Sequence, residues 1–201
     1  MKVAIIDYGA GNVPSVARAL QKLGAPSGRA GTAEELAAAD AIILPGVGHY
    51  AALIGALDRR GLRGPLVDAI LRGKPFLGIC LGLQALYQSS EEAPRLPGLG
   101  ILRGRICALP EGVKLPHMGW NRLKIRRESR LLEGLGESDY FYFAHTFAAG
   151  AANAETLAVC DYGAEFGAAL EVDRICAVQF HPEKSGAAGA KLLGNFLRLA
   201  L

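Results

Sequence analysis

One cysteine lies between two glycines at the end of an apolar run. The stretch Gly78-Ile79-Cys80-Leu81-Gly82 follows the run PFLGI and precedes residues with helical spacing. A buried structural thiol needs no flanking glycines, but a thiol on a tight strand-to-helix bend does, because flanking side chains would collide. Such a bend puts the thiol at the carboxyl end of a strand, where open α/β sheets bind ligands. It also puts the thiol at the N-terminus of a helix, which favours the thiolate. The pattern predicts that Cys80 is a nucleophile, with the Leu81 N–H as an oxyanion donor.

A nucleophilic cysteine needs a base, and His181 is the histidine placed to serve. It follows the apolar run RICAVQF, and Glu183 comes two residues later, on the same side of an extended backbone. The carboxylate is therefore expected to orient the imidazole, as in a catalytic triad. For a lone H-x-E motif, the alternative is a solvated histidine beside a surface glutamate. The presence of the cysteine bend in the same chain favours the triad.

Two further glycine-rich turns follow predicted strands. The turn PGVG at 45–48 can bring its backbone close to a ligand and supply a second oxyanion N–H, although many turns look like it. The turn DYGAGN at 7–12 resembles the start of a dinucleotide-binding fingerprint, but Pro14 stands where its third glycine belongs. We therefore exclude nucleotide binding there, and expect a tight turn with Asn12 near a helix start.

The elements that must position these residues follow from apolar periodicity. Buried strands are predicted at 2–7, 41–45 and 75–79, alternating with helices at 13–23, 32–39 (with Thr32 as N-cap), 62–72 and 81–90. This alternation indicates a parallel sheet covered on both faces. The second half carries six strand-like runs, at 101–109, 121–125, 139–145, 156–162, 166–172 and 174–180, before an amphipathic helix at 185–201. The fold class is therefore α/β, with a mixed, mostly parallel central sheet and an antiparallel extension.

Composition narrows the class of protein. The 201 residues carry a net charge of +3, too little to argue for nucleic-acid binding, and suit a single domain spanning residues 1–201. No apolar run is long enough for a membrane span and no signal peptide is apparent, so we expect a cytoplasmic protein. The other cysteines, Cys107, Cys160 and Cys176, lie in strand-like apolar runs and form no CxxC pair, so we expect small buried side chains and no metal site.

These motifs together resemble the class I (triad) glutamine amidotransferases. Within that class, the chain looks most like the glutaminase subunits of imidazole glycerol phosphate synthases. The resemblance runs almost end to end, through DYGAGN, LPGVGHY, GICLGLQAL, SSEEAP, LPHMGWN, YFAHTF and QFHPEKS. C-x-G-x-Q with H-P-E is typical of the class, and PGVG, PHMGWN and HPEKS narrow it to the subunit.

The resemblance implies a reaction and a role for each matching residue. Cys80 would attack the side-chain amide of glutamine, His181 would protonate the departing ammonia and then activate water, and Glu183 would orient His181. The implied oxyanion donors come from Val47, Gly48 and Leu81, and the implied glutamine-binding residues are Gly46, Gln84, Thr146 and Phe147. No cofactor is implied.

The resemblance also implies a partner. Ammonia would pass to a separate (β/α)8-barrel synthase/cyclase subunit, forming a heterodimer that makes imidazole glycerol phosphate and AICAR in histidine biosynthesis. The residues matching positions near that interface are Asn12, Trp120, Tyr142 and Lys184, each with an ordinary core, rim or surface role as its alternative.

The sequence differs from the usual family pattern at two places, and three other functions are alternatives to the one implied. Val13-Pro14 stand where Leu-Arg is common, and Phe147 replaces the usual tyrosine, so no hydroxyl can act there. A glutaminase subunit of another ammonia-using synthase shares the triad, and the LPHMGWN and PGVGHY motifs argue against it. The H-P-E order and the position of Gln84 argue against a cysteine hydrolase or peptidase. The intact set of Cys80, His181 and Glu183 argues against a catalytically silent binding module.

Overall fold

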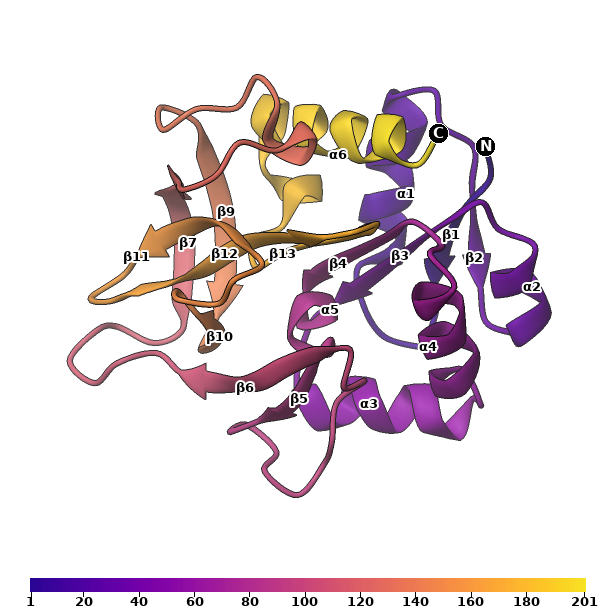
Figure 1. The fold of residues 1–201 in the computed structure, drawn as a ribbon, viewed down its shortest axis with the longest axis horizontal. Helices are drawn as coiled ribbons and strands as arrows, with labels where there is room; N and C mark the ends of the chain where they lie inside the picture. The colour runs from indigo at the N-terminus through magenta and orange to yellow at the C-terminus, as the bar shows by residue number, and fades with distance from the viewer.

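The computed structural model describes residues 1–201 and is built around one large mixed sheet (Figure 1). Five neighbouring strands are parallel, in the spatial order β2 (Ser27–Ala30), β1 (Val3–Ile6), β3 (Ala41–Gly46), β4 (Phe76–Cys80) and β13 (Ile175–Val178). In β1, β3 and β4 every residue is buried, as expected for strands covered on both faces.

The second half of the chain extends this sheet with mainly antiparallel pairs. The order continues with β12 (Glu165–Val172), β10 (Phe147–Gly150), β6 (Leu102–Ala108) and β5 (Tyr87–Ser90); β11 (Thr156–Asp161) pairs with β12 and with β8 (Lys124–Ile125). Only the β5–β6 pair in this part is parallel. The predicted parallel sheet with an antiparallel extension is confirmed.

A separate two-stranded ribbon lies beside the sheet. It consists of β7 (His117–Arg122) and β9 (Tyr140–His145), paired so that Trp120 faces Tyr142 and His117 faces His145. The strand expected at 121–125 is instead divided, because Arg122 ends β7 and the short β8 joins the large sheet.

Helices cover both faces of the sheet, and each face has its own apolar core. On one face lie α1 (Val13–Lys22) and α6 (Gly186–Leu199), and on the other lie α3 (Tyr50–Arg59) and α4 (Arg63–Leu71), as Figure 1 shows. The short segments are α2 (Ala33–Ala37), α5 (Leu81–Gln84), and the 3-10 helices η1 (Arg130–Leu132) and η2 (Pro182–Lys184). Thr32 caps α2 as predicted, with Glu35 completing a capping box.

The helix predicted at 81–90 is wrong beyond its first turn. It ends at Gln84, and residues 87–90 form β5 instead. The carbonyl groups that would continue the helix are taken by a distant segment, because the Leu99 N–H donates to Ala85 and the Leu102 N–H donates to Leu86. Tertiary hydrogen bonds therefore override the local helical pattern. The sequence reading also missed β2, β10 and α3.

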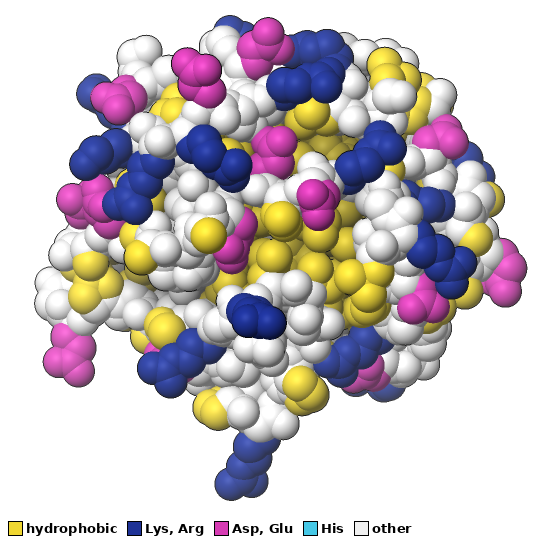
Figure 2. Space-filling model, viewed as in Figure 1, with side chains coloured by type: hydrophobic (Ala, Val, Ile, Leu, Met, Phe, Trp, Pro, Cys, Tyr) yellow, Lys and Arg dark blue, Asp and Glu magenta, His cyan; other side chains and the backbone are white.

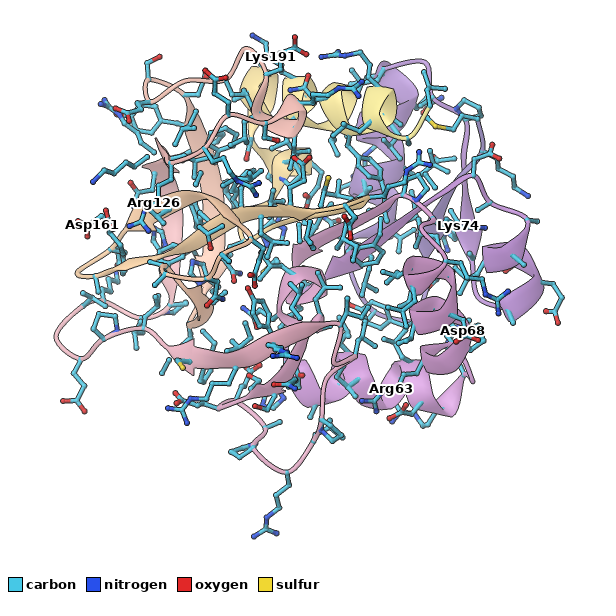
Figure 3. All side chains as sticks on the ribbon, in the orientation of Figure 1. Arg63, Asp68, Lys74, Arg126, Asp161 and Lys191 are labelled. Atoms are coloured by element: carbon cyan, nitrogen blue, oxygen red, sulfur yellow. The ribbon has the colours of Figure 1, made fainter.

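Surface charges of both signs are interspersed over the face shown in Figure 2, without a large patch of one sign. Lys124 and Arg126 both pair with Glu165. Lys74, labelled in Figure 3, lies before β4 and donates to the carbonyls of Leu36, Ala37 and Ala39, which secures the end of α2. None of the helices combines the length and apolar character needed to cross a membrane.

Cys160 and Cys176 are buried, as expected, but Cys107 is only half-buried. It lies near the sheet's edge on β6, where only Leu102 and Ile106 are fully buried. The expectation of a buried side chain is therefore wrong for Cys107. An apolar run on a strand near the sheet edge does not guarantee burial on both faces.

Candidate active site

The bend at Cys80 has the geometry that the glycine pattern predicts. β4 ends at Cys80 and α5 begins at Leu81, and Cys80 has φ 55° and ψ −107°. A positive φ in a residue with a side chain is strained, at a cost of roughly 1–3 kcal/mol. Such strain persists only where the surrounding structure enforces it. Here it turns a 3% exposed thiol toward a cavity at the carboxyl end of the parallel strands.

The glycines around Cys80 are required by close backbone contacts. A Cβ on Gly78 would lie 2.6 Å from the Gly82 carbonyl oxygen, and a Cβ on Gly82 would lie 2.0 Å from the Leu44 carbonyl oxygen. A Cβ on Gly46 would lie 2.4 Å from the Leu81 Cβ. Gly46 therefore lets β3 pack directly under the bend. It is not among the residues that line the cavity.

His181 and Glu183 contact one another as the H-x-E spacing predicts. His181 Nδ1 lies 2.9 Å from Glu183 Oε1, and their side chains are 2% and 1% exposed. The His181 backbone is held on both sides, because its N–H donates to the Tyr142 carbonyl and its carbonyl accepts from the Ser185 hydroxyl. With Nδ1 bonded to the carboxylate, Nε2 is left for the thiol.

The charges in this group favour a protonated imidazole. Burial lowers the pKa of His181, but hydrogen bonds and charge interactions with Cys80 and Glu183 outweigh it and raise the pKa to about 9. His181 is therefore cationic at neutral pH and places a positive charge beside the Cys80 side chain.

A cavity of about 330 Å³ opens over Cys80, at the small end of the range for small-molecule sites. Of the predicted residues, the structure brings together in its wall Val47, Gly48, Cys80, Leu81, Gln84, Thr146, Phe147, His181 and Lys184. Two larger cavities, of about 530 and 570 Å³, contain neither Cys80 nor His181. Of these three cavities, only the one of about 330 Å³ is lined by Cys80 and His181.

Gln84 sits at one end of a buried chain of amides. Its Nε2 donates to the Phe147 carbonyl at 2.7 Å and to Gln179 Oε1 at 3.1 Å, and Gln179 Nε2 lies 3.5 Å from Cys80 Sγ. Gln84 Oε1 is buried without a partner.

Two residues near the cavity were missed by the sequence reading. Gln179 is 0% exposed within the apolar run that precedes His181, and a polar residue in a buried run was an available signal. Glu92 lines the cavity, and its carboxylate accepts from the Tyr50 N–H at 2.8 Å. Glu92 lies in the quoted SSEEAP motif, but no role was assigned to it, because it reaches the cavity from the loop after β5.

The turn at 45–48 lines the same cavity through Val47 and Gly48. The N–H groups of Val47 and Gly48 donate no hydrogen bond to a backbone carbonyl. Gly48 has φ +90°. Beside them lies Tyr8, 3% exposed, whose hydroxyl also lacks a partner. Burial raises the pKa of Tyr8 to about 12, while the nearby Val47 backbone acts to lower it.

The four predicted interface residues do not form a single cluster. The Trp120 and Tyr142 rings lie 6.0 Å apart, edge to face, and Lys184 Nζ lies 5.4 Å from the centre of the Tyr142 ring. Trp120 is 54% exposed, so it is not a core residue. Asn12 is placed elsewhere, with its side-chain amide 3.2 Å from Glu183 Oε1.

Comparison with known proteins agrees with this geometry. A family model described as glutamine amidotransferase class-I matches residues 4–200. "Imidazole glycerol phosphate synthase subunit HisH" of Methanothermobacter thermautotrophicus is 50% identical over 197 residues, covering 98% of both chains. The protein of the same name from Aquifex aeolicus is 45% identical over 202 residues, covering 100% of this chain and 98% of its own.

Two solved structures share the fold at low sequence identity. A structure described as "Crystal structure of glutamine amidotransferase" has a TM-score of 0.79 at 22% identity, covering 98% of both chains. "Structure of PurLQS from Thermotoga maritima" has a TM-score of 0.76 at 20% identity, covering 98% of this chain and 97% of that one. The chain thus belongs to the class-I glutamine amidotransferases and, among them, to the family of imidazole glycerol phosphate synthase subunits HisH.

Proposed function

We propose that this chain hydrolyses glutamine to glutamate and ammonia through a thioester on Cys80. The single observation that carries the proposal is the strained Cys80 at the cavity floor, with a buried His181–Glu183 pair beside it. A thiol held beside a cationic imidazole is an activated nucleophile. The relatives named above, which match over nearly the whole chain, support the same reaction.

The proposed reaction follows from the positions of the groups. Cys80 Sγ attacks the amide carbon of glutamine, and the negative charge on its oxygen is stabilised by N–H groups of Leu81 and of Val47 or Gly48. The His181 proton passes to the amide nitrogen, the C–N bond breaks and ammonia leaves. His181 then takes a proton from water, whose oxygen attacks the thioester and releases glutamate.

We assign glutamine binding to residues in and beside the wall of the cavity. Gln84, Thr146, Phe147 and Gly46 form the predicted set, and the presence of the first three in the cavity wall supports it. Glu92 is an acidic group in the wall, suited to pair with the α-ammonium of an amino acid. The Phe147 carbonyl accepts from Gln84, so the site uses its backbone and does not require the missing tyrosine hydroxyl.

The ammonia is proposed to pass to a (β/α)8-barrel synthase/cyclase subunit that makes imidazole glycerol phosphate and AICAR in histidine biosynthesis. Trp120, Tyr142 and Lys184 would contact it in a heterodimer, and Lys184 also lines the cavity, which supports docking next to the place where ammonia forms. Residues 1–201 are taken as one glutamine amidotransferase domain in the cytoplasm.

Replacing the thiol tests the proposal. Cys80→Ala should abolish glutamine hydrolysis, because alanine offers no nucleophile, while a complex with the partner should still use added ammonia. Steady-state assays with each nitrogen source measure both. Cys160→Ala is the matched control, since burial raises the pKa of that thiol to about 12 and it should form no thioester. Glutaminase activity retained by Cys80→Ala would refute the assignment.

A further inference from the structure

Asn12 stands directly before α1 but does not act as a helix cap. Asparagine is among the preferred capping residues because its side chain accepts from the first N–H groups of a helix. In α1 no such hydrogen bond is formed, although Asn12 occupies the capping position. Its amide points the other way and donates from Nδ2 to Glu183 Oε1 at 3.2 Å, across 171 residues of sequence.

Glu183 has few other partners. Its side chain is 1% exposed, and Oε1 receives both the Asn12 amide and His181 Nδ1, while Oε2 is buried with no hydrogen bond. A buried carboxylate with an unpaired oxygen is costly and tends to turn toward any donor within reach. Asn12 is the neutral group that holds the carboxylate on the His181 side.

Two cationic side chains, Arg18 and Lys22, line a cavity that Glu183 also lines, and they could attract its carboxylate away from His181. This cavity, of about 460 Å³ between α1 and α6, is lined by Glu183 together with Ser15, Arg18 and Lys22. A carboxylate that turned into this cavity would meet water and positive charge, and would leave His181 with one partner fewer. The two sides of Glu183 thus offer it alternative positions, and the Asn12 hydrogen bond favours the one used by the triad.

We propose that Asn12 is a positioning residue for the His181–Glu183 pair, holding the carboxylate against the imidazole and away from the cavity behind it. The proposal rests on the proposed glutaminase function and deepens it. It gives the turn at 7–12 a role that neither nucleotide binding nor helix capping supplies. Asn12 does not line the glutamine cavity, so it acts through Glu183 alone.

The test is the titration of His181, followed by NMR of histidine-labelled protein. The ionisable groups that face His181 from all neighbouring elements are Cys80, Tyr142, His145, Glu183 and Lys184. Replacing Asn12 adds or removes none of these ionisable groups. In the unaltered chain the pKa of His181 is about 9. Asn12→Ala should lower it by at least about one unit, toward the ordinary value, because Glu183 moves away while burial remains.

Two further variants sharpen the result. Asn12→Ser removes the amide but supplies a strong helix cap, so it keeps the start of α1 and should lower the pKa in the same way. Ser15→Ala, which alters the cavity behind Glu183 without touching the carboxylate, is the matched control and should leave the pKa unchanged. Glutaminase turnover should fall about 10-fold in both Asn12 variants with KM unchanged.

An unchanged or higher pKa of His181 in the folded Asn12 variants would overturn the proposal. A rise in KM with turnover intact would do the same, since it would place Asn12 at the substrate. The titration requires no glutamine, so it reports on Asn12 even if Cys80→Ala shows that the proposed function is wrong. Thermal melts of each variant identify any that fails to fold, and the serine variant then decides.

Discussion

The buried histidines of this molecule fall into two groups, one cationic and one neutral at pH 7. His181 is held cationic by Cys80 and Glu183. His117 and His145 are held neutral, because burial lowers the pKa of His117 to about 4 and that of His145 to about 3. These two rings contact each other at 3.1 Å, and His145 Nδ1 lies 3.0 Å from the Phe147 carbonyl. At the level of single residues, burial and partners decide which histidine can transfer a proton near neutral pH.

The free energy of unfolding should therefore be largest near pH 6.5. Above that pH, the folded chain holds a proton on His181 that the unfolded chain has lost, so stability falls as pH rises toward about 9. Below it, the unfolded chain protonates His117 and His145 while the folded chain does not, so stability falls again toward about pH 4. Each side should change by an amount on the order of a few kcal/mol.

Urea unfolding between pH 4 and pH 8 measures this dependence below the range in which the buried thiols of Cys160 and Cys176 also contribute. His181→Gln should flatten the alkaline side only, and His145→Gln should remove only its share of the fall on the acid side, because His117 contributes the rest. An alkaline side that survives in His181→Gln would show that another group carries it.

At the scale of elements, the catalytic bend depends on the contact between α5 and β3. Gly46 and Gly82 let the two backbones approach until no side chain fits between them. The same closeness holds Cys80 at positive φ, because the strand before it and the helix after it are both fixed in the core. The reactive conformation of one residue is thus maintained by the packing of two elements.

Gly82→Ala should destabilise the chain by roughly 3 kcal/mol or more, because its Cβ would lie 2.0 Å from the Leu44 carbonyl oxygen and the backbone must move. Gly194→Ala is the matched control, since it lies inside α6 with nothing within 4 Å of the new Cβ. That control should stabilise the chain by about 0.5–1 kcal/mol. Chemical denaturation measures both, and equal effects at the two sites would contradict the packing argument.

At the scale of the whole molecule, the cavity lies next to an exposed aromatic surface. Trp120 and Tyr142 are paired across the β7–β9 ribbon, and Lys184 contacts that ribbon while lining the cavity. The Tyr142 carbonyl also holds the His181 N–H. A partner bound to this surface would contact Tyr142, and Tyr142 is hydrogen-bonded to His181 of the triad.

Trp120→Ala should weaken the complex with the barrel subunit by about 2 kcal/mol, roughly 30-fold in Kd, because exposed tryptophans are typical binding hot spots. Glutamine hydrolysis by the chain alone should not change. Leu71→Ala, which alters an exposed apolar side chain on α4, is the control and should not affect binding. Calorimetric titration with the partner measures both, and equal Kd values for Trp120→Ala and the unaltered chain would remove Trp120 from the interface.

The isolated chain should be a poor glutaminase that becomes active with its partner and the partner's ligand. The turn at 45–48 can hold its peptide in more than one orientation, and an oxyanion site lacking one donor loses roughly 100- to 1000-fold in turnover. The gain on binding should appear in kcat more than in KM, because that donor acts on the transition state. Full turnover by the purified chain without a partner would exclude this form of control.

The glycine spacing around Cys80, the H-x-E pair and the apolar runs were sufficient to predict the strand-to-helix bend, the His181–Glu183 contact and the parallel strands. These features are local, since a tight bend and a buried strand each impose their demands on a few consecutive residues. The alternation of strands and helices also predicted the mixed sheet, and the quoted motifs identified the family.

Only the tertiary structure decided which distant groups meet. α5 stops at Gln84 because residues 99–102 bond to the carbonyls that follow it, and no pattern within 81–90 records that competition. Glu92, Gln179 and the Asn12 amide reach the site from three separate segments, joined through the packed core. The charge on His181 is likewise a tertiary property, because desolvation and two partners brought together by folding set its pKa.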